Sequence, residues 1–366
     1  MPRGVGFLLA MMGAALATTL ILLQGVRLSG VPEPWTSLDA AERFMETAAE
    51  MAGSDPDARR IAVVGDSTAV SYPPDRRLSA RLAQRWQTEW PSARVFDFSQ
   101  VGLGPLEQWA MAEVLAGARP AGVLLGFNLA SLSPAWEEHP RRPEWVGWVP
   151  PERLPRSSAL LARMGMSLDE LASAVGVVAA GGQNLWRAVL HGRQQIATQR
   201  RRSLARLGGP VARPAPYPYG DPVRAYLNRP EGAQRLSAVL EEQYAAAFSG
   251  VERDRVSLSL LGETVRRLHG VGAEVWVFVV PINLEVLRNQ AFFDEQGLAR
   301  TLKRLQRVVE SAGGRWMDLH ALLPAAGFQD VGGHFTLSPL DGPDRVAEAL
   351  AVAIPGPPAR NGKRAN

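Results

Sequence analysis

The sequence contains no cysteine. This absence excludes disulfide bonds, thiolate metal sites, a cysteine nucleophile and an anchor in which a lipid is attached to cysteine. Histidine is also scarce, with 5 residues in a chain of 366. No cluster of histidines and carboxylates has the spacing of a zinc site, and no glycine-rich phosphate loop of the P-loop kind occurs. We therefore expect no cofactor.

Neither sign of charge is in large excess. The formal net charge is +4, from 40 Lys and Arg against 36 Asp and Glu, although the pI is about 9.8. An excess of this size does not indicate a nucleic-acid-binding protein, so we expect no nucleic-acid partner. Apolar residues make up 46% of the chain, which is normal for a folded protein with a sizeable core.

One long apolar run stands at the amino terminus. Residues 4–26 contain no charged residue and are numerous enough to cross a hydrocarbon core of about 30 Å. Arg3 precedes the run, and a positively charged start favours a cytoplasmic amino terminus with an exported body. We predict an uncleaved membrane anchor over residues 1–30. A cleavable signal peptide remains open, although the small-residue cleavage pattern is unclear, and a buried helix would lack a polar face.

Short apolar runs alternate with helical stretches through most of the remaining chain. Residues 31–57 are predicted to form a linker and a short amphipathic helix, which begins near Ser37. Strands are predicted at residues 61–64, 94–98, 122–126, 273–280 and 314–318. Helices are predicted between them at residues 78–90, 106–116, 257–269 and 299–311. This alternation is typical of an α/β fold, here a three-layer α/β/α domain with a five-stranded parallel sheet in flavodoxin-like order.

Residues 136–250 interrupt this rhythm. They separate the third strand from the fourth by far more than one crossover helix requires, so we predict a helical insertion there. The catalytic domain is accordingly assigned to residues 58–354. The proline-rich, basic end of the chain, residues 355–366, is predicted to be a disordered tail.

A Gly65-Asp66-Ser67 block directly follows the first predicted strand. Ligands of open parallel sheets bind at the carboxyl ends of the strands, so Ser67 is expected on the binding edge. A serine hydroxyl is a poor nucleophile until a base removes its proton, and that base must come from elsewhere in the fold. The block alone is weak evidence, because Gly, Asp and Ser are common in a simple capped turn between a strand and a helix.

His334 is the candidate base, because it lies after the last predicted strand in a loop that could return to the same edge. Asp330 could orient its imidazole and stabilise the imidazolium, as in a catalytic triad. His320, just after Asp318, is the rival base. Its place at the start of a helix-like, leucine-rich stretch favours a structural role.

In this order the blocks resemble the SGNH (GDSL-like) hydrolase superfamily, whose pattern is a Ser in a Gly-Asp-Ser block, then a Gly, then an Asn, then a late Asp and His. Gly102 or Gly104 would match the glycine block, and Asn128 would match the asparagine block. The resemblance implies that the Ser67 N–H, that glycine N–H and the Asn128 amide converge on the oxyanion of a tetrahedral intermediate. It covers residues 61–127 and 275–346.

The sequence departs from the family pattern at the acid. The family usually places its Asp and His one residue closer together than Asp330 and His334 stand here. Gly332 and Gly333 could absorb the extra residue as a bulge. Otherwise, Asp318 or a backbone carbonyl could support the imidazole.

The resemblance implies a serine esterase or O-acyltransferase that forms a Ser67 acyl-enzyme. Membrane-anchored relatives with a similar layout include alginate O-acetyltransferases and the D-alanine transfer protein of teichoic acid synthesis, which work beside multi-spanning membrane acyltransferases. By this analogy we expect ester-linked acyl groups, acetyl above all, of a cell-envelope polysaccharide as substrate. We also expect a multi-spanning membrane partner and a catalytic domain in the periplasm or outside the cell. A catalytically inactive binding or scaffold subunit of such a complex is the alternative.

Overall fold

The computed structural model describes residues 37–55, 57–134, 136, 230–251, 255–329, 333–338 and 340–354. The predicted anchor, most of the predicted insertion and the predicted tail lie outside the described residues. Within the described ranges, no helix is both long enough and apolar enough to cross a membrane.

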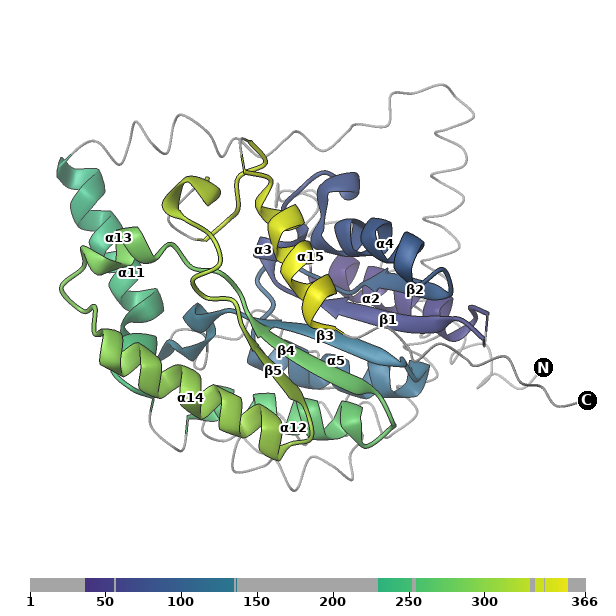
Figure 1. Ribbon diagram of the computed structural model, residues 1–366. Coiled ribbons are helices and arrows are strands. Elements are labelled where there is room, and N and C mark those ends of the chain that lie inside the picture. The colour runs from purple at the N-terminus through teal and green to yellow at the C-terminus, as the bar shows by residue number, and fades with distance from the viewer. Residues whose placement is uncertain are drawn as a thin grey trace, which may run out of the picture. The chain divides into compact units, whose positions relative to one another are not determined.

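A parallel sheet forms the centre of the domain (Figure 1). Its strand order is β2-β1-β3-β4-β5, which is the flavodoxin-like order. The prediction of an α/β fold with a five-stranded parallel sheet is therefore confirmed. The strands lie close to the predicted runs and are β1 (Arg59–Val64), β2 (Ala93–Asp97), β3 (Gly122–Phe127), β4 (Glu274–Val279) and β5 (Arg315–Asp318).

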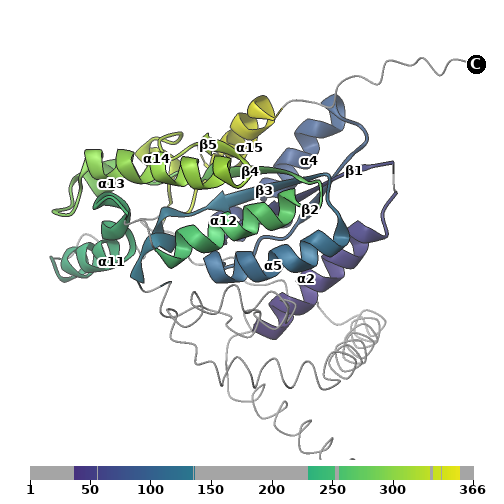
Figure 2. The ribbon, with the colours of Figure 1, turned by 90° about the horizontal axis from the view of Figure 1, so that it is seen from below.

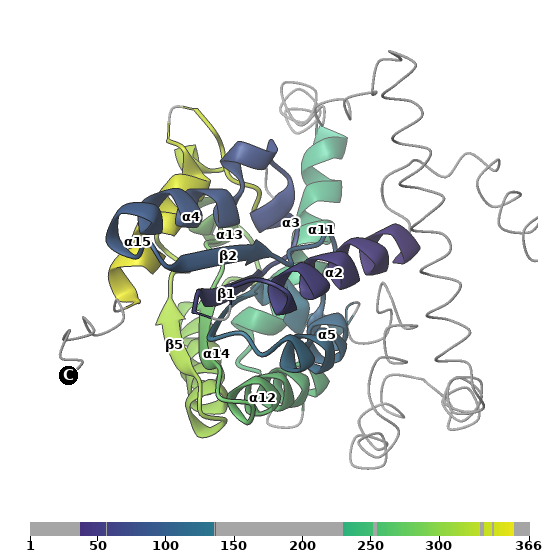
Figure 3. The same cartoon turned by 90° about the vertical axis from the view of Figure 1, so that its right-hand side faces the viewer.

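Helices cover both faces of the sheet (Figures 2 and 3). On one face α4 packs against α15, and on the other α5 packs against α12, with α14 beside α12 and β5. Of these, α15 was not predicted, while the others match predicted helices. The bounds are α4 (Leu78–Glu89), α5 (Pro105–Ala118), α12 (Val256–His269), α14 (Glu295–Ser311) and α15 (Gly342–Ala353).

The core follows from the alternation of side chains along the buried strands. Ile61 and Val63 point to the face covered by α4 and α15, where they join Trp276 and Phe278 in one apolar cluster. Every residue of β3 is buried, whereas the edge strand β5 is only partly buried. A continuous apolar run in a central strand therefore reports burial on both faces.

Two flanking helices complete the described chain. Helix α2 (Ser37–Ala52) begins where a helix was predicted, and its Phe44 ring lies edge-on to Phe98 at 5.0 Å. Helix α11 (Pro230–Phe248) lies within the predicted insertion. It packs against α14 and the short helix η2 (Leu129–Leu132).

Candidate active site

A very tight turn places Ser67 at the carboxyl edge of the sheet. Strand β1 ends at Val64, and the short helix α3 (Ser67–Val70) begins after only two residues. A Cβ atom on residue 65 would lie 2.7 Å from the Ala69 Cβ, closer than side chains approach. Glycine is therefore required at position 65, and it brings the half-buried Ser67 out of the strand at the edge where ligands bind.

The Asp66 carboxylate organises this turn. One oxygen accepts hydrogen bonds from the Thr68 backbone N–H at 2.9 Å and from the Thr68 hydroxyl at 2.6 Å. The other oxygen accepts from the Asn128 amide nitrogen at 2.7 Å. Because Asn128 follows β3 and Asp66 follows β1, this bond joins neighbouring strands beside Ser67.

Asn128 was predicted to donate to the oxyanion, and its amide group has other partners. Its oxygen accepts from the Ala130 N–H at 3.0 Å, and its nitrogen donates to Asp66. An amide nitrogen carries two hydrogens, so one hydrogen remains for a substrate beside the bond to Asp66. Asn128 lies in the expected place, and its participation in an oxyanion hole stays a prediction.

Both glycine candidates lie in the segment between β2 and α5. The Gly104 N–H donates to a Glu107 carboxylate oxygen at 3.1 Å at the start of α5. That bond uses the only hydrogen that Gly104 could offer to an oxyanion. Gly102 has a left-handed backbone, with φ of 67°, in the loop that follows β2. Gln100 of the same loop donates to the Gly65 carbonyl at 2.9 Å, so the loop lies against the Ser67 turn. The role of Gly102 as an oxyanion donor stays a prediction.

The Ser67 hydroxyl and the Ser67 backbone N–H are both available to a substrate, as far as the described part of the chain is concerned. Neither its hydroxyl nor its backbone N–H makes a hydrogen bond to a described residue. Its carbonyl, in contrast, accepts from the Ser71 N–H at 3.0 Å. A substrate at this edge could therefore meet an unoccupied hydroxyl and an unoccupied donor.

The segment that carries His334 returns to the Ser67 side of the fold. The Phe335 N–H donates to the Tyr72 hydroxyl at 2.7 Å, and Tyr72 comes directly after the capping residue of α3. The Tyr72 and Phe335 rings also stack, with centroids 6.4 Å apart. Segments whose contacting residues are 263 positions apart in the sequence thus lie side by side.

His334 itself is half-buried, and its carbonyl accepts from the Gln329 N–H at 2.9 Å. No hydrogen bond joins it to the Ser67 hydroxyl among the described contacts. Catalytic groups often lie farther apart in apo structures than in the substrate complex. The pairing of His334 with Ser67 stays a prediction. Asp330 lies outside the described residues, and its orienting role stays a prediction.

The rival base His320 has a carboxylate partner. Its Nδ1 lies 2.6 Å from the Asp318 Oδ1 at the end of β5. Burial raises the pKa of Asp318, but the hydrogen bond and the charge of His320 outweigh it, so the pKa is lowered below its usual value. Asp318 is therefore engaged by His320 and is a poor substitute for Asp330.

The prediction of a helix-like stretch beginning at His320 is wrong. Residues 320–323 form a turn and a bend, and a short 3-10 helix, η6 (Ala325–Gly327), follows. Of the leucines in this stretch, Leu323 is buried in the core cluster, Leu319 packs against that cluster and Leu322 is exposed. The His320 carbonyl accepts from the Ile282 N–H at 3.0 Å, which ties β5 to the segment after β4.

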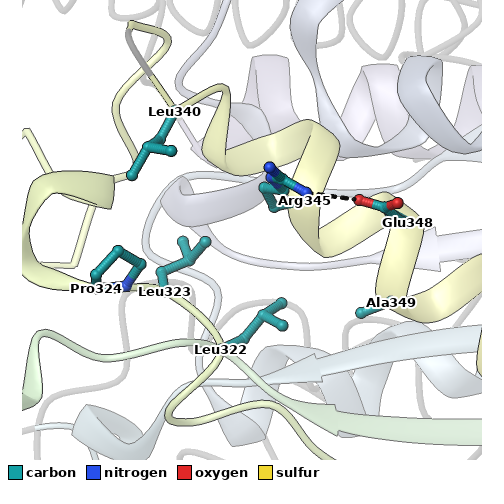
Figure 4. Close-up of a pocket in the computed structure, with 7 residues that line it drawn as sticks. All are labelled: Leu322, Leu323, Pro324, Leu340, Arg345, Glu348 and Ala349. Atoms are coloured by element: carbon teal, nitrogen blue, oxygen red, sulfur yellow. Dashed lines mark hydrogen bonds and ion pairs between the residues drawn. The ribbon is translucent and has the colours of Figure 1, made fainter.

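A mainly apolar pocket of about 360 Å³ lies beside α15 (Figure 4). Its lining residues come from α15 and from the chain on either side of the segment that carries His334. Two of them, Arg345 and Glu348, form an ion pair with atoms 3.2 Å apart. None of the predicted site residues that the structure describes lines it. The lining residues are Leu322, Leu323, Pro324, Leu340, Arg345, Glu348 and Ala349.

Among the described residues, no group of three or more His, Asp or Glu side chains could hold a metal ion. The expectation that the chain needs no cofactor stays a prediction.

Two residues of this region were not anticipated. Asp66 was visible as part of the Gly-Asp-Ser block, and its position just before a helix is typical of a capping residue. Tyr72 gave no such signal, because its partner is a backbone N–H far away in the sequence.

No family model and no curated protein matches the chain. Among solved structures, the crystal structure of TesA is 12% identical, with a TM-score of 0.38, and the match covers 81% of this chain and 99% of TesA. The crystal structure of LAE5, an alpha/beta hydrolase enzyme from the metagenome of Lake Arreo, Spain, is 12% identical, with a TM-score of 0.39. That match covers 83% of this chain and 97% of LAE5. Structural similarities this weak do not support a conclusion about the activity of this chain.

Proposed function

We propose that the chain is a serine acyl hydrolase or O-acyltransferase of the SGNH type, with Ser67 as nucleophile and His334 as base. The observation that carries this proposal is the hydrogen bond from the Phe335 N–H to the Tyr72 hydroxyl, at 2.7 Å. It supports the proposal because it ties the peptide next to His334 to the residue that follows the Ser67 helix.

The reaction would begin when His334 takes the proton of the Ser67 hydroxyl. The serine oxygen attacks the ester carbonyl carbon, and the negative charge of the tetrahedral intermediate is stabilised by the N–H groups of Ser67 and Gly102 and the Asn128 amide. The bond to the leaving alkoxide then breaks, and the alkoxide takes the proton from the imidazolium. Asp330 would stabilise that imidazolium.

The acyl-enzyme is then resolved by an acceptor hydroxyl. Water, deprotonated by His334, would release a carboxylic acid and complete an esterase cycle. A sugar hydroxyl would take the acyl group instead and complete a transferase cycle. In both cases Ser67 leaves as the alkoxide and recovers a proton from His334.

We also propose where the reaction takes place and on which substrate. An anchor over residues 1–30 would hold the catalytic domain at the outer side of the cell membrane, in the periplasm or outside the cell. Ester-linked acetyl groups of an envelope polysaccharide are the substrate we propose, and a multi-spanning membrane acyltransferase is the partner, because a single span offers no path for a donor across the bilayer.

Covalent labelling with a fluorophosphonate tests the nucleophile. The full-length wild-type chain should be labelled at Ser67, and Ser67→Ala should lose the label. Ser71→Ala is the matched control, because Ser71 stands at the other end of α3 and should leave labelling intact. Equal labelling of wild type and Ser67→Ala would eliminate the mechanism.

A catalytically inactive binding or scaffold subunit is the second candidate. The observation in its favour is that the Ser67 hydroxyl makes no hydrogen bond to a described residue, His334 included. A properly folded wild-type chain that resists labelling altogether would favour this second function.

A further inference from the structure

The peptide group between His334 and Phe335 is held from both sides. Its carbonyl accepts from the Gln329 N–H at 2.9 Å, and its N–H donates to the Tyr72 hydroxyl at 2.7 Å. A planar peptide group bonded at both ends cannot rotate without losing a bond. These two bonds therefore fix the peptide group on the carbonyl side of His334.

Tyr72 is itself firmly packed. Its side chain is 6% exposed, and its ring lies nearly parallel to that of Phe335, at an interplanar angle of 10°. Phe335 also contacts the Phe328 ring, with centroids 5.9 Å apart. A hydrogen bond in such an apolar environment is strong, and water cannot readily replace it.

A short, internally bonded stretch joins Tyr72 to Ser67. The Ser71 N–H donates to the Ser67 carbonyl at 3.0 Å, and the Tyr72 N–H donates to the Val70 carbonyl at 2.8 Å. These bonds limit how far Tyr72 can move relative to the nucleophile. The Tyr72 hydroxyl is thus fixed to the Ser67 side and bonded to the His334 side.

We infer that Tyr72 is a positioning residue whose hydroxyl sets the orientation of His334 relative to Ser67. This inference rests on the proposed function. Tyr72 acts through the His334–Phe335 peptide and does not touch the reacting atoms. Misplacement of a catalytic group by about 1 Å can cost about a hundredfold in rate, so one hydrogen bond can control the reaction.

The test is the rate at which a fluorophosphonate labels Ser67 in the full-length chain, measured over the pH range in which imidazole titrates. Tyr72→Phe keeps the stacked ring and removes only the hydroxyl. Labelling should become about ten- to a hundredfold slower. The rise of the rate with pH, which reports deprotonation of the imidazole base, should also flatten, an effect that a purely structural role would not produce.

Thr301→Val is the matched control. The Thr301 hydroxyl also accepts from a buried backbone N–H, that of Val251 at 3.2 Å, but it lies on α14. Thr301 is 0% exposed, so its loss costs a comparable buried hydrogen bond. Thr301→Val should be labelled at the wild-type rate. Wild-type labelling of Tyr72→Phe, or equal slowing of both variants, would overturn the inference.

An amide-to-ester replacement at Phe335 covers the case in which Tyr72→Phe does not fold. It removes the N–H donor and keeps the Tyr72 hydroxyl, and it should slow labelling as Tyr72→Phe does. Unchanged labelling would again overturn the inference. If wild type is labelled no more than Ser67→Ala, the proposed function fails and this inference with it. If wild type is labelled normally and both Tyr72→Phe and the ester at Phe335 are labelled at the wild-type rate, only the inference about Tyr72 is wrong.

Discussion

At the scale of single residues, the site is organised by backbone contacts as much as by side-chain chemistry. Gly65 is fixed by steric exclusion, since a Cβ there would lie 2.7 Å from the Ala69 Cβ. Asp66 bonds three donors, two from Thr68 and one from Asn128, and so joins the ends of β1 and β3. These neighbours hold the turn that presents Ser67.

The two candidate bases can be told apart at this scale. His334→Ala should lower kcat/KM for hydrolysis of p-nitrophenyl acetate by about 10²- to 10⁴-fold, the usual contribution of a general base. His320→Ala is the control, because it removes an imidazole of the same kind whose Nδ1 is already paired with Asp318. It should leave the activity near that of the wild type. The reverse pattern would assign the base to His320.

At the scale of elements, the start of α15 is bound to α4 and to the short helix η1 (Pro74–Arg76). Asp341 caps α15 through the Asp344 N–H at 3.3 Å and pairs with Arg76 at 3.0 Å. It also pairs with Arg81, which is 14% exposed. The Gly342 N–H donates to the Thr336 carbonyl at 2.8 Å, so the same junction limits the carboxyl-terminal end of the His334 segment.

Asp341 should therefore be important for stability. Asp341→Ala removes the cap and both ion pairs, and should lower the free energy of unfolding by about 2 kcal/mol. Asp341→Asn keeps a good cap and loses only the charge, so it should cost about half as much, roughly 1 kcal/mol. Denaturant unfolding of the full-length chain, followed by circular dichroism, measures both.

Asp75→Asn is the control for this series. Asp75 also pairs with Arg76, at 3.6 Å, but its side chain is 78% exposed. Exposed ion pairs contribute little, so this variant should unfold like the wild type. An Asp341→Ala chain as stable as Asp75→Asn would show that the junction does not hold α15 in place.

At the scale of the whole molecule, the proposed anchor decides where the chemistry takes place. The unbroken apolar run at residues 4–26 should partition into the bilayer and resist extraction by alkaline carbonate. The full-length chain should remain in the membrane pellet, and a chain without residues 1–30 should be released. Deletion of residues 355–366 is the control and should leave the chain in the pellet. Release of the full-length chain would rule the anchor out.

The sequence by itself determined the layout of the domain, because local patterns report it. Each central strand is a continuous apolar run, and α4, α5, α12 and α14 have the pattern of helices that cover a sheet. The α/β class, the parallel sheet and the position of Ser67 after β1 followed from these signals. Helix α15 was not predicted individually, and the leucines after His320 were read as a helix where the chain turns.

Only the tertiary structure decided which groups meet. The Asp66–Asn128 bond depends on the pairing of β1 with β3. The contact of Tyr72 with the Phe335 N–H joins segments that are far apart in the sequence. Periodicity reports only which face of an element is buried. Hydrogen bonds between distant segments depend on the packing of the whole chain, so no local pattern could have predicted them.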